Sequence, residues 1–392
     1  MKNKKYNFDN VVNRINTGSL KYSEGPNVLP MWVADMDYHV LPEIKESILK
    51  TAEVDAYGYK ETLDDYFKAY QSFYKRHHDV DFEIDEAIFS LGVVASIDSI
   101  FRHHFKKGDK VLVFTPVYHI FFHCIENNEL GLVELPLKYE DSEYKLDLNE
   151  VEKVIKNQDI KVLLLCNPNN PTGNIYTLDE LNTLAKLCFE NKVLLISDEI
   201  HGEIVDNDTK YNSILKVETS YLQNVVALFS GSKVFNIAGL QSSLIVTKNK
   251  KLRESIQDGV YKDDIGEPNY FAVNANIAAF TKGDDYIYEL NDYIFENKKY
   301  VEEFLKKSLS NLKYIKTKAT YLLWVDISYY SNDSVKFAVD LKRKTGLYVS
   351  NGAQFKGNGN NFIRINVATS LANVKLAMNK LKQYISDTYK DK

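Results

Sequence analysis

KVLLLCNPNNPTG, the stretch from Lys161 to Gly173, decides the fold of this 392-residue chain. Its apolar start is typical of a short strand that is buried on both faces. The NPNNPTG that follows must be a turn, because two prolines and a glycine can continue neither a strand nor a helix. Leu178–Asn191 then places its apolar residues on one helical stripe, and Thr177 stands before it as a capping residue. The stretch therefore predicts a strand, a turn and a helix in succession.

The same alternation extends on both sides of this unit, from about residue 85 to residue 250. Four more apolar runs of strand length are separated by amphipathic stretches: Val111–Phe114, Val193–Ser197, Val225–Ser230 and Ser243–Thr247. Continuous apolar strands between helices indicate βαβ units and a mainly parallel sheet with helices on both faces. The predicted fold class is α/β.

After about residue 285 the pattern changes to mixed helices and strands. We expect a long charged helix, two strands and two shorter helices there: Ile287–Leu312, Tyr321–Ile327 and Phe362–Val367, then Ser334–Lys344 and a last helix from Leu371. The sequence thus predicts a large domain of residues 46–284 and a smaller α+β domain of residues 1–45 plus 285–392.

Composition narrows the class of protein. Lys and Arg number 49 against 54 Asp and Glu, a net charge of −5, and no basic block suggests nucleic-acid binding. No apolar run approaches the ~20 residues that cross a membrane, and no apolar segment of a signal peptide follows the basic start. The three cysteines are an odd number without CxxC spacing, which is typical of a reducing interior. We expect a cytoplasmic enzyme or binding protein that uses neither membrane nor nucleic acid.

Three polar side chains follow three of the predicted strands. They are Asn170, Asp198 and Lys233, in NPNNPTG, DEIH and SGSK. Ligands of open α/β sheets bind at the carboxyl ends of the strands, so these side chains should meet in one crevice. A lysine amine for a Schiff base, a carboxylate for a pyridine nitrogen and a donor for a ring oxygen are what pyridoxal 5′-phosphate needs.

Other residues would complete a site for this cofactor. Val93 and Val94 open a predicted helix whose amino end suits a phosphate, and Tyr118 could stack on the ring. Ser230 and Ser232 come just before Lys233 and could also bind the cofactor.

Each of these residues also has a simpler interpretation. A lysine after a strand is usually a surface charge, Asp198 could cap a helix, and Arg364 in FIRIN could be an ion-pair partner. The spacing of His119 and His123 could present two nitrogens to a metal, but no third ligand accompanies them, and we expect no metal site. The three strand-end motifs together favour the cofactor site.

NPNNPTG, DEIH and SGSK, in this order and spacing, resemble the class I/II aminotransferase family of fold-type I pyridoxal-phosphate enzymes. The resemblance covers nearly the whole chain and implies the PLP-dependent transferase-like fold. WVADMD near the start, YGY, TPVYH and SKVFNIAGLQ resemble one branch, the MalY/PatB-type cystathionine β-lyases that cleave C–S bonds.

The resemblance implies a role for each matched residue. Lys233 matches the Schiff-base lysine and Asp198 the pyridinium partner, while Asn170 matches the amide at the ring oxygen and the substrate. Arg364 matches the clamp for the substrate α-carboxylate. Tyr59 matches a tyrosine that reaches the phosphate across a dimer, which implies a homodimer with shared active sites.

Two departures separate the chain from ordinary transaminases. His201 stands where they usually have a tyrosine, so its contact to the ring oxygen differs, and Gln241 stands where they usually have an arginine for the phosphate. Both are typical of the C–S lyase branch. The resemblance implies β-elimination from L-cystathionine or related S-conjugates of L-cysteine, giving a thiol, pyruvate and ammonia. Two alternatives stay open: an amino-acid aminotransferase, and a regulatory protein that binds a transcription factor.

Overall fold

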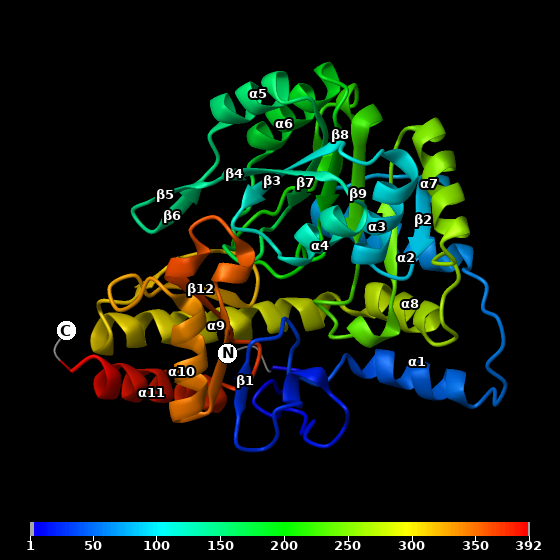
Figure 1. Ribbon diagram of the computed structural model, residues 1–392. Coiled ribbons are helices and arrows are strands. Elements are labelled where there is room, and N and C mark those ends of the chain that lie inside the picture. Colours follow the sequence, from blue (N-terminus) through cyan, green and yellow to red (C-terminus); the bar gives the residue numbers. More distant parts are fainter. Residues whose placement is uncertain (1–3, 391–392) are drawn as a thin grey trace.

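The computed structural model describes residues 4–390, and its centre is a seven-stranded sheet (Figure 1). The order of the strands is β2-β10-β9-β8-β7-β3-β4. Their bounds are β2 Ala87–Ser90, β3 Lys110–Thr115, β4 Gly131–Pro136, β7 Ile160–Cys166, β8 Leu194–Asp198, β9 Val225–Phe229 and β10 Ser243–Val246. Every strand that the sequence predicted in this region is present.

Strands β4, β3, β7, β8 and β9 run parallel, and β10 is antiparallel to both of its neighbours. The sheet is therefore mainly parallel, as predicted, with one reversed strand. In the register of β7 and β8, Cys166 pairs with Asp198, the last residue of each strand. The parallel direction thus brings the NPNNPTG turn and the DEIH turn out at the same edge.

Helices cover both faces of this sheet. The helices before residue 284 are α1 Pro42–Ala52, α2 Asp64–His78, α3 Val93–His104, α4 Ile120–Asn127, α5 Leu148–Asn157, α6 Leu178–Glu190, α7 Lys250–Lys262 and α8 Ala272–Lys282. Successive strand residues point into two different clusters. Leu163 and Leu165 pack with α2, α5, α6 and α8, whereas Val162 and Leu164 pack with α3, α4 and α7. Burial on both faces explains why these strands are continuously apolar.

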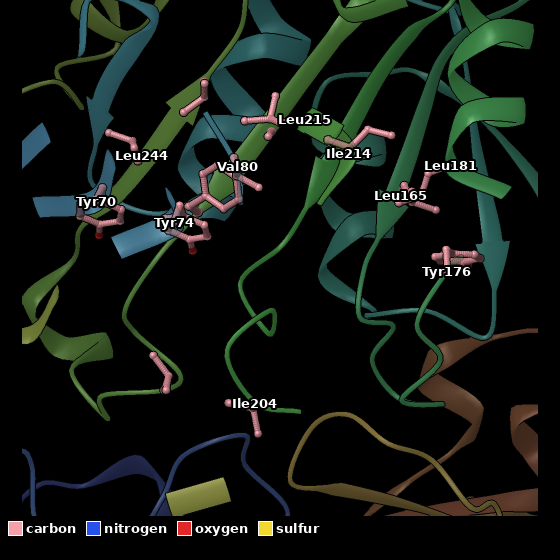
Figure 2. Close-up of a cluster of buried hydrophobic side chains, with 14 of the residues drawn as sticks. Tyr70, Tyr74, Val80, Leu165, Tyr176, Leu181, Ile204, Ile214, Leu215 and Leu244 are labelled. Atoms are coloured by element: carbon pink, nitrogen blue, oxygen red, sulfur yellow. The ribbon is translucent and has the colours of Figure 1, made fainter. Parts of the chain in front are cut away.

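Figure 2 shows part of the first cluster, in which aromatic and aliphatic side chains meet. Tyr70 and Tyr74 of α2 lie near Leu244 of β10, and Leu165 of β7 lies beside Leu181 of α6. Helix α6 begins where the sequence predicted it. Thr177 Oγ1 accepts from the Glu180 amide at 3.2 Å, and the Glu180 carboxylate accepts from the Thr177 amide at 2.8 Å. This reciprocal cap satisfies two amide donors at the end of the helix.

A second, five-stranded sheet has the order β1-β13-β14-β12-β11. Its strands are β1 Leu29–Met31, β11 Lys313–Tyr314, β12 Leu322–Asp326, β13 Leu347–Asn351 and β14 Phe362–Asn366, and its helices are α9 Asp284–Ser308, α10 Ser334–Thr345 and α11 Leu371–Thr388. The three helices pack on one face, and Trp324 and Phe362 on the other face join the core of the large sheet. The long helix α9 ends at Ser308, four residues before the predicted end, and Leu309 and Leu312 pack into the core beyond it.

A small hairpin bridges the two sheets. Its strands β5 Lys138–Glu140 and β6 Glu143–Lys145 extend from the large sheet over the small one (Figure 1). The Tyr139 hydroxyl donates to Asp326 at 2.9 Å, and the Trp324 indole donates to the Tyr144 hydroxyl at 3.0 Å. The N-terminal strand β1 also joins the small sheet, beside β13. The domain boundaries at residues 45/46 and 284/285 stay a prediction.

Within residues 4–390, the helices are each too short or too polar to traverse a lipid bilayer.

Candidate active site

A cavity of about 410 Å³ opens at the carboxyl ends of β7 and β8. Eight of the residues predicted from the sequence line it: Val93, Val94, Tyr118, Asn170, Asp198, His201, Ser232 and Lys233. They lie at or after the ends of five strands, β2, β3, β7, β8 and β9, and the order of the strands in the sheet is what gathers them.

Asp198 is the last residue of β8, and its side chain is buried at the cavity wall. The Ile200 amide donates to its carboxylate at 3.1 Å. Burial raises the pKa of Asp198 to about 6, although the Ile200 amide and the charge of Lys233 oppose this shift. A cationic ring nitrogen would provide the buried carboxylate with a stronger partner than either of these.

Lys233 lies four residues beyond β9 and its ammonium donates to the backbone carbonyl of Ala34 at 2.9 Å. Burial lowers the pKa of this lysine, while the nearby charges of Asp35 and Asp198 raise it. A lysine whose pKa is depressed has a larger neutral fraction, and the neutral amine is the form that attacks a carbonyl or accepts a proton.

Arg364 lies in the middle of β14 and is buried. Its Nη1 donates to Asn170 Oδ1 at 2.9 Å, and its Nη2 donates to the Trp32 carbonyl at 2.8 Å and to Ser350 Oγ at 3.3 Å. Burial lowers the pKa of Arg364 to about 10, so the group is still a cation at neutral pH. This guanidinium bonds to the loop of Asn170 and forms no salt bridge with a carboxylate of the described residues, which suits a substrate carboxylate.

His201 is buried in the wall, and its Nδ1 is without a hydrogen-bond partner within the described chain. Burial and the charges of Lys233 and Arg364 lower the pKa of His201 to about 3, so the ring is neutral. A neutral imidazole can donate to or accept from a ring oxygen. Burial raises the pKa of the nearby Tyr118 to about 12, so this hydroxyl keeps its proton.

The amino end of α3 reaches the cavity through Gly92, Val93 and Val94. Gly92 offers no capping side chain, and the first turn has no acidic residue, so the amide groups of this turn can serve an anion. Ser232 lines the cavity. Ser230 does not; its hydroxyl lies 2.7 Å from that of Ser232 and donates to the Ser242 carbonyl.

Tyr59, which was predicted at the site, and the pair His119 and His123 do not line this cavity. Tyr59 is 98% exposed, in the stretch before α2, and the cavity is built without it. His119 follows Tyr118, with the two rings 5.2 Å apart, and the His119 and His123 rings are 6.1 Å apart. Burial lowers the pKa of His119 to about 4.

Sequence reasoning missed several residues of the wall. Ala34, Cys166 and Ile265 line the cavity, and Trp32 and Ser350 hold Arg364. The contacts of Ala34 and Trp32 use backbone carbonyls, which no side-chain motif reveals. The one sequence signal for these two residues was the WVADMD stretch, which contains both of them and resembles the MalY/PatB branch.

The residues of the cavity fit pyridoxal 5′-phosphate. The buried carboxylate of Asp198 suits the ring nitrogen of the cofactor, and the Lys233 amine suits its aldehyde. The uncapped amino end of α3 suits the phosphate. The unpartnered Nδ1 of buried His201 is a further polar atom for the ring.

Comparisons with known proteins agree with this geometry. Residues 18–381 match the family model of aminotransferase class I and II. The chain is 30% identical to the cystathionine β-lyase PatB of Bacillus subtilis over 97% of this chain and 100% of that protein. A crystal structure of a PLP-bound putative aminotransferase from Clostridium difficile 630 superposes with a TM-score of 0.94 at 32% identity, covering 97% and 100% of the two chains. A PLP-bound C-S lyase from Staphylococcus hominis superposes with a TM-score of 0.90 at 31% identity, covering 98% and 100%.

The chain therefore belongs to the aminotransferase class I and II family, with the PLP-dependent transferase fold. Within this family it is a pyridoxal-phosphate-dependent carbon–sulfur lyase of the PatB and MalY type. The predictions of fold, cofactor and branch are confirmed. The roles of the individual site residues stay predictions.

Proposed function

We propose that this chain cleaves the Cβ–S bond of L-cystathionine or related S-conjugates of L-cysteine by β-elimination. The observation that carries the proposal is one cavity that holds Lys233 and Asp198, with Arg364 bonded to its Asn170 wall. Such a constellation can bind an α-amino acid by its carboxylate and remove its Cα proton.

The substrate would be oriented by its α-carboxylate. The guanidinium of Arg364 would donate two hydrogen bonds to it, and Asn170 Nδ2 would be free to add a third, since its Oδ1 already accepts from Arg364. Because the carboxylate would be held from β14 and Lys233 follows β9, the substrate would lie between these two groups.

Proton removal falls to Lys233. When bound, the cofactor supplies a carbonyl carbon that joins the substrate amine and a ring that accepts the electrons of the broken Cα–H bond. Lys233 would take the Cα proton as general base. Asp198 would stabilise the protonated ring nitrogen, and His201 and Tyr118 would hold the ring in place.

The elimination step then balances without an oxidant. The electron pair from the Cα–H bond forms the Cα=Cβ bond while the Cβ–S pair leaves with sulfur as a thiolate. The released enamine takes up water and yields pyruvate and ammonia. Transamination shares every residue up to the loss of the proton, and it differs in returning that proton to the cofactor. The named relatives favour the lyase, since PatB is a cystathionine β-lyase and the Staphylococcus hominis structure is a C-S lyase.

Exposed Tyr59 supports the prediction of a homodimer. A tyrosine that is 98% exposed in one chain is available to a second chain, and the amino end of α3 has no side-chain cap of its own. The cytoplasmic location predicted from the sequence stays a prediction.

One assay tests the reaction. The PLP-loaded protein is incubated with L-cystathionine, and separately with L-cysteine, in the absence of any keto acid, and pyruvate is followed together with thiol or sulfide. Equal amounts of pyruvate and thiol over many turnovers are expected. Amino transfer only after 2-oxoglutarate is added would make the chain an aminotransferase. Inactivity in both assays, with a bound cofactor, would favour the regulatory alternative.

A further inference from the structure

Residues 32–38, which follow β1, form an irregular segment that the proposed mechanism leaves unexplained. Each backbone carbonyl of this segment accepts a hydrogen bond from another part of the chain. Irregular backbone usually satisfies its carbonyls with water. Complete pairing with protein donors means that this segment is held in one position.

Two of these carbonyls hold the two cations of the candidate site. The Ala34 carbonyl accepts from Lys233 Nζ at 2.9 Å, and the Trp32 carbonyl accepts from Arg364 Nη2 at 2.8 Å. Lys233 belongs to the large sheet's side of the molecule and Arg364 to the small sheet. The segment therefore sets the position of both cations relative to each other.

Two asparagine side chains hold the segment. Asn366 bonds to the residues before and after Ala34, and Asn236 bonds further along, at Met36 and Tyr38. Asn366 Nδ2 donates to the carbonyls of Val33 at 2.6 Å and Asp35 at 2.7 Å. Asn236 Nδ2 donates to the carbonyls of Met36 and Tyr38 at 3.0 and 3.1 Å, and its Oδ1 accepts from the Met36 amide. Each asparagine follows its cation closely, Asn236 after Lys233 and Asn366 after Arg364.

Ion pairs hold the segment from its other side. Arg14 donates to Asp35 at 2.7 Å and to Asp37 at 2.8 Å, and buried Lys21 donates to Asp37 at 2.8 Å. The N-terminal arm thus fixes the side chains of both aspartates, and it also donates to their carbonyls, from Lys21 Nζ to Asp35 at 2.9 Å and from the Val12 amide to Asp37 at 2.8 Å. Sliding the segment would break both sets of bonds together.

We propose that Asn366 and Asn236 are positioning residues, which hold the 32–38 segment so that its Ala34 and Trp32 carbonyls keep the Lys233 amine and the Arg364 guanidinium in place. Only the expected effect on turnover rests on the proposed function. A lysine side chain has four rotatable carbon–carbon bonds, so a fixed acceptor narrows the positions that the free amine visits. The charged groups that face this amine are Asp35 of the segment, Asp198 of β8 and Arg364 of β14.

The first test uses the cofactor-free protein. Lys233 is labelled with acetic anhydride at a series of pH values, and the midpoint is measured by peptide mass spectrometry. Asn366→Ala is expected to lower this midpoint by about half a pH unit or more, because the carbonyl acceptor favours the ammonium form and is lost. The matched control is Asn276→Ala. Asn276 of α8 is also a buried amide, and its side chain bonds to the Ala272 carbonyl and the Tyr70 hydroxyl, so the Lys233 midpoint in this variant should equal that of the parent protein.

A second variant guards against misfolding. Asn236 has φ 57°, in the left-handed region that glycine adopts readily, so Asn236→Gly removes the side chain without straining the backbone. It is expected to lower the Lys233 midpoint as Asn366→Ala does.

The kinetic test separates positioning from folding. In the loaded enzyme, Asn366→Ala and Asn366→Asp are both expected to lose about 10- to 100-fold in kcat/KM, with a higher KM because Arg364 is less fixed. Asn366→Asp keeps the acceptor for the Ala368 amide and lacks the donor to the Val33 and Asp35 carbonyls, so a role that rests on the acceptor alone would be restored by it. Restored activity in Asn366→Asp, or parental labelling midpoints in both Asn366→Ala and Asn236→Gly, would overturn the proposal. Because labelling needs no substrate, an enzyme that fails to cleave cystathionine still tests it.

Discussion

Arg364 on β14 donates to Oδ1 of Asn170 at 2.9 Å, across 194 residues of sequence. Asn170 belongs to the turn after β7 of the large sheet, and β14 lies at the centre of the small sheet. The bond therefore joins the two halves of the candidate site. The other terminal nitrogen of Arg364, Nη2, donates to the Trp32 carbonyl. The orientation of the guanidinium is therefore set before any substrate binds.

Arg364→Lys should weaken substrate binding. Lysine keeps the charge but cannot donate a planar pair of hydrogen bonds to a carboxylate, so we expect kcat/KM for L-cystathionine to fall about 100-fold, chiefly through KM. Steady-state kinetics of pyruvate release measures this effect. Arg343→Lys, on the exposed end of α10, is the control and should behave like the parent protein. An unchanged KM in Arg364→Lys would mean that another group binds the carboxylate.

Lys233→Ala should lose both the covalent link to the cofactor and the general base. Borohydride reduction of the loaded parent protein is expected to attach the cofactor to the peptide of Lys233, and the absorbance near ~420 nm should be absent in the variant. Activity should fall by about 10²–10⁴-fold or more. Exposed Lys336→Ala is the control. A reduced cofactor found on a different lysine would refute the assignment.

Asp198→Asn should stabilise the cofactor-free protein while it impairs the enzyme. Burial raises the pKa of Asp198 to about 6, from an ordinary 3.8. Between these two pH values the folded state binds more protons at this site than the unfolded state, so the parent protein loses stability as the pH rises toward 6. The asparagine side chain does not titrate, so the Asp198→Asn variant does not lose this stability as the pH rises. The stability advantage of Asp198→Asn should therefore grow from about pH 4 to pH 6, reach ~2–3 kcal/mol and stay level above that.

Urea unfolding of the cofactor-free proteins across this pH range measures the advantage. Asp258→Asn, at an exposed position on α7, serves as the control and should show no such trend. An advantage that is already complete at pH 4 would contradict the raised pKa. In the loaded enzyme, Asp198→Asn should instead slow elimination, because a neutral amide cannot hold the ring nitrogen protonated.

Complementation tests whether two chains share each active site. Tyr59→Ala and Lys233→Ala are each expected to be nearly inactive. If Tyr59 serves the partner's site, a mixed dimer has one site with both changes and one intact site. Random mixing should then restore about one quarter of the parental activity, because half of the dimers are mixed and half of their sites are intact. Activity that stays at the level of the separate variants would place Tyr59 and Lys233 in the site of the same chain, and parental activity of Tyr59→Ala alone would place Tyr59 outside the site.

The sequence by itself determined the class of fold and the kind of chemistry. The strands β3, β7, β8, β9 and β10 were predictable because both of their faces are buried, which demands continuous apolar residues. Asn170, Asp198 and Lys233 were predictable as neighbours because each lies at the end of a strand or within four residues of it, and the carboxyl ends of parallel strands meet at one edge of the sheet.

The short strands of the second sheet and the hairpin were less visible, since β1, β11, β5 and β6 have at most three residues each and carry no periodic pattern.

Only the tertiary structure decided how the two cations are held. Arg364 acquires its orientation from Asn170 and from the Trp32 carbonyl, which are distant in sequence. The Ala34 carbonyl accepts a hydrogen bond from Lys233. Because every residue has a backbone carbonyl, no residue type indicates which one accepts. The sequence specifies the chemistry of each side chain directly. The position of a backbone acceptor is defined only after segments from both sheets have packed together.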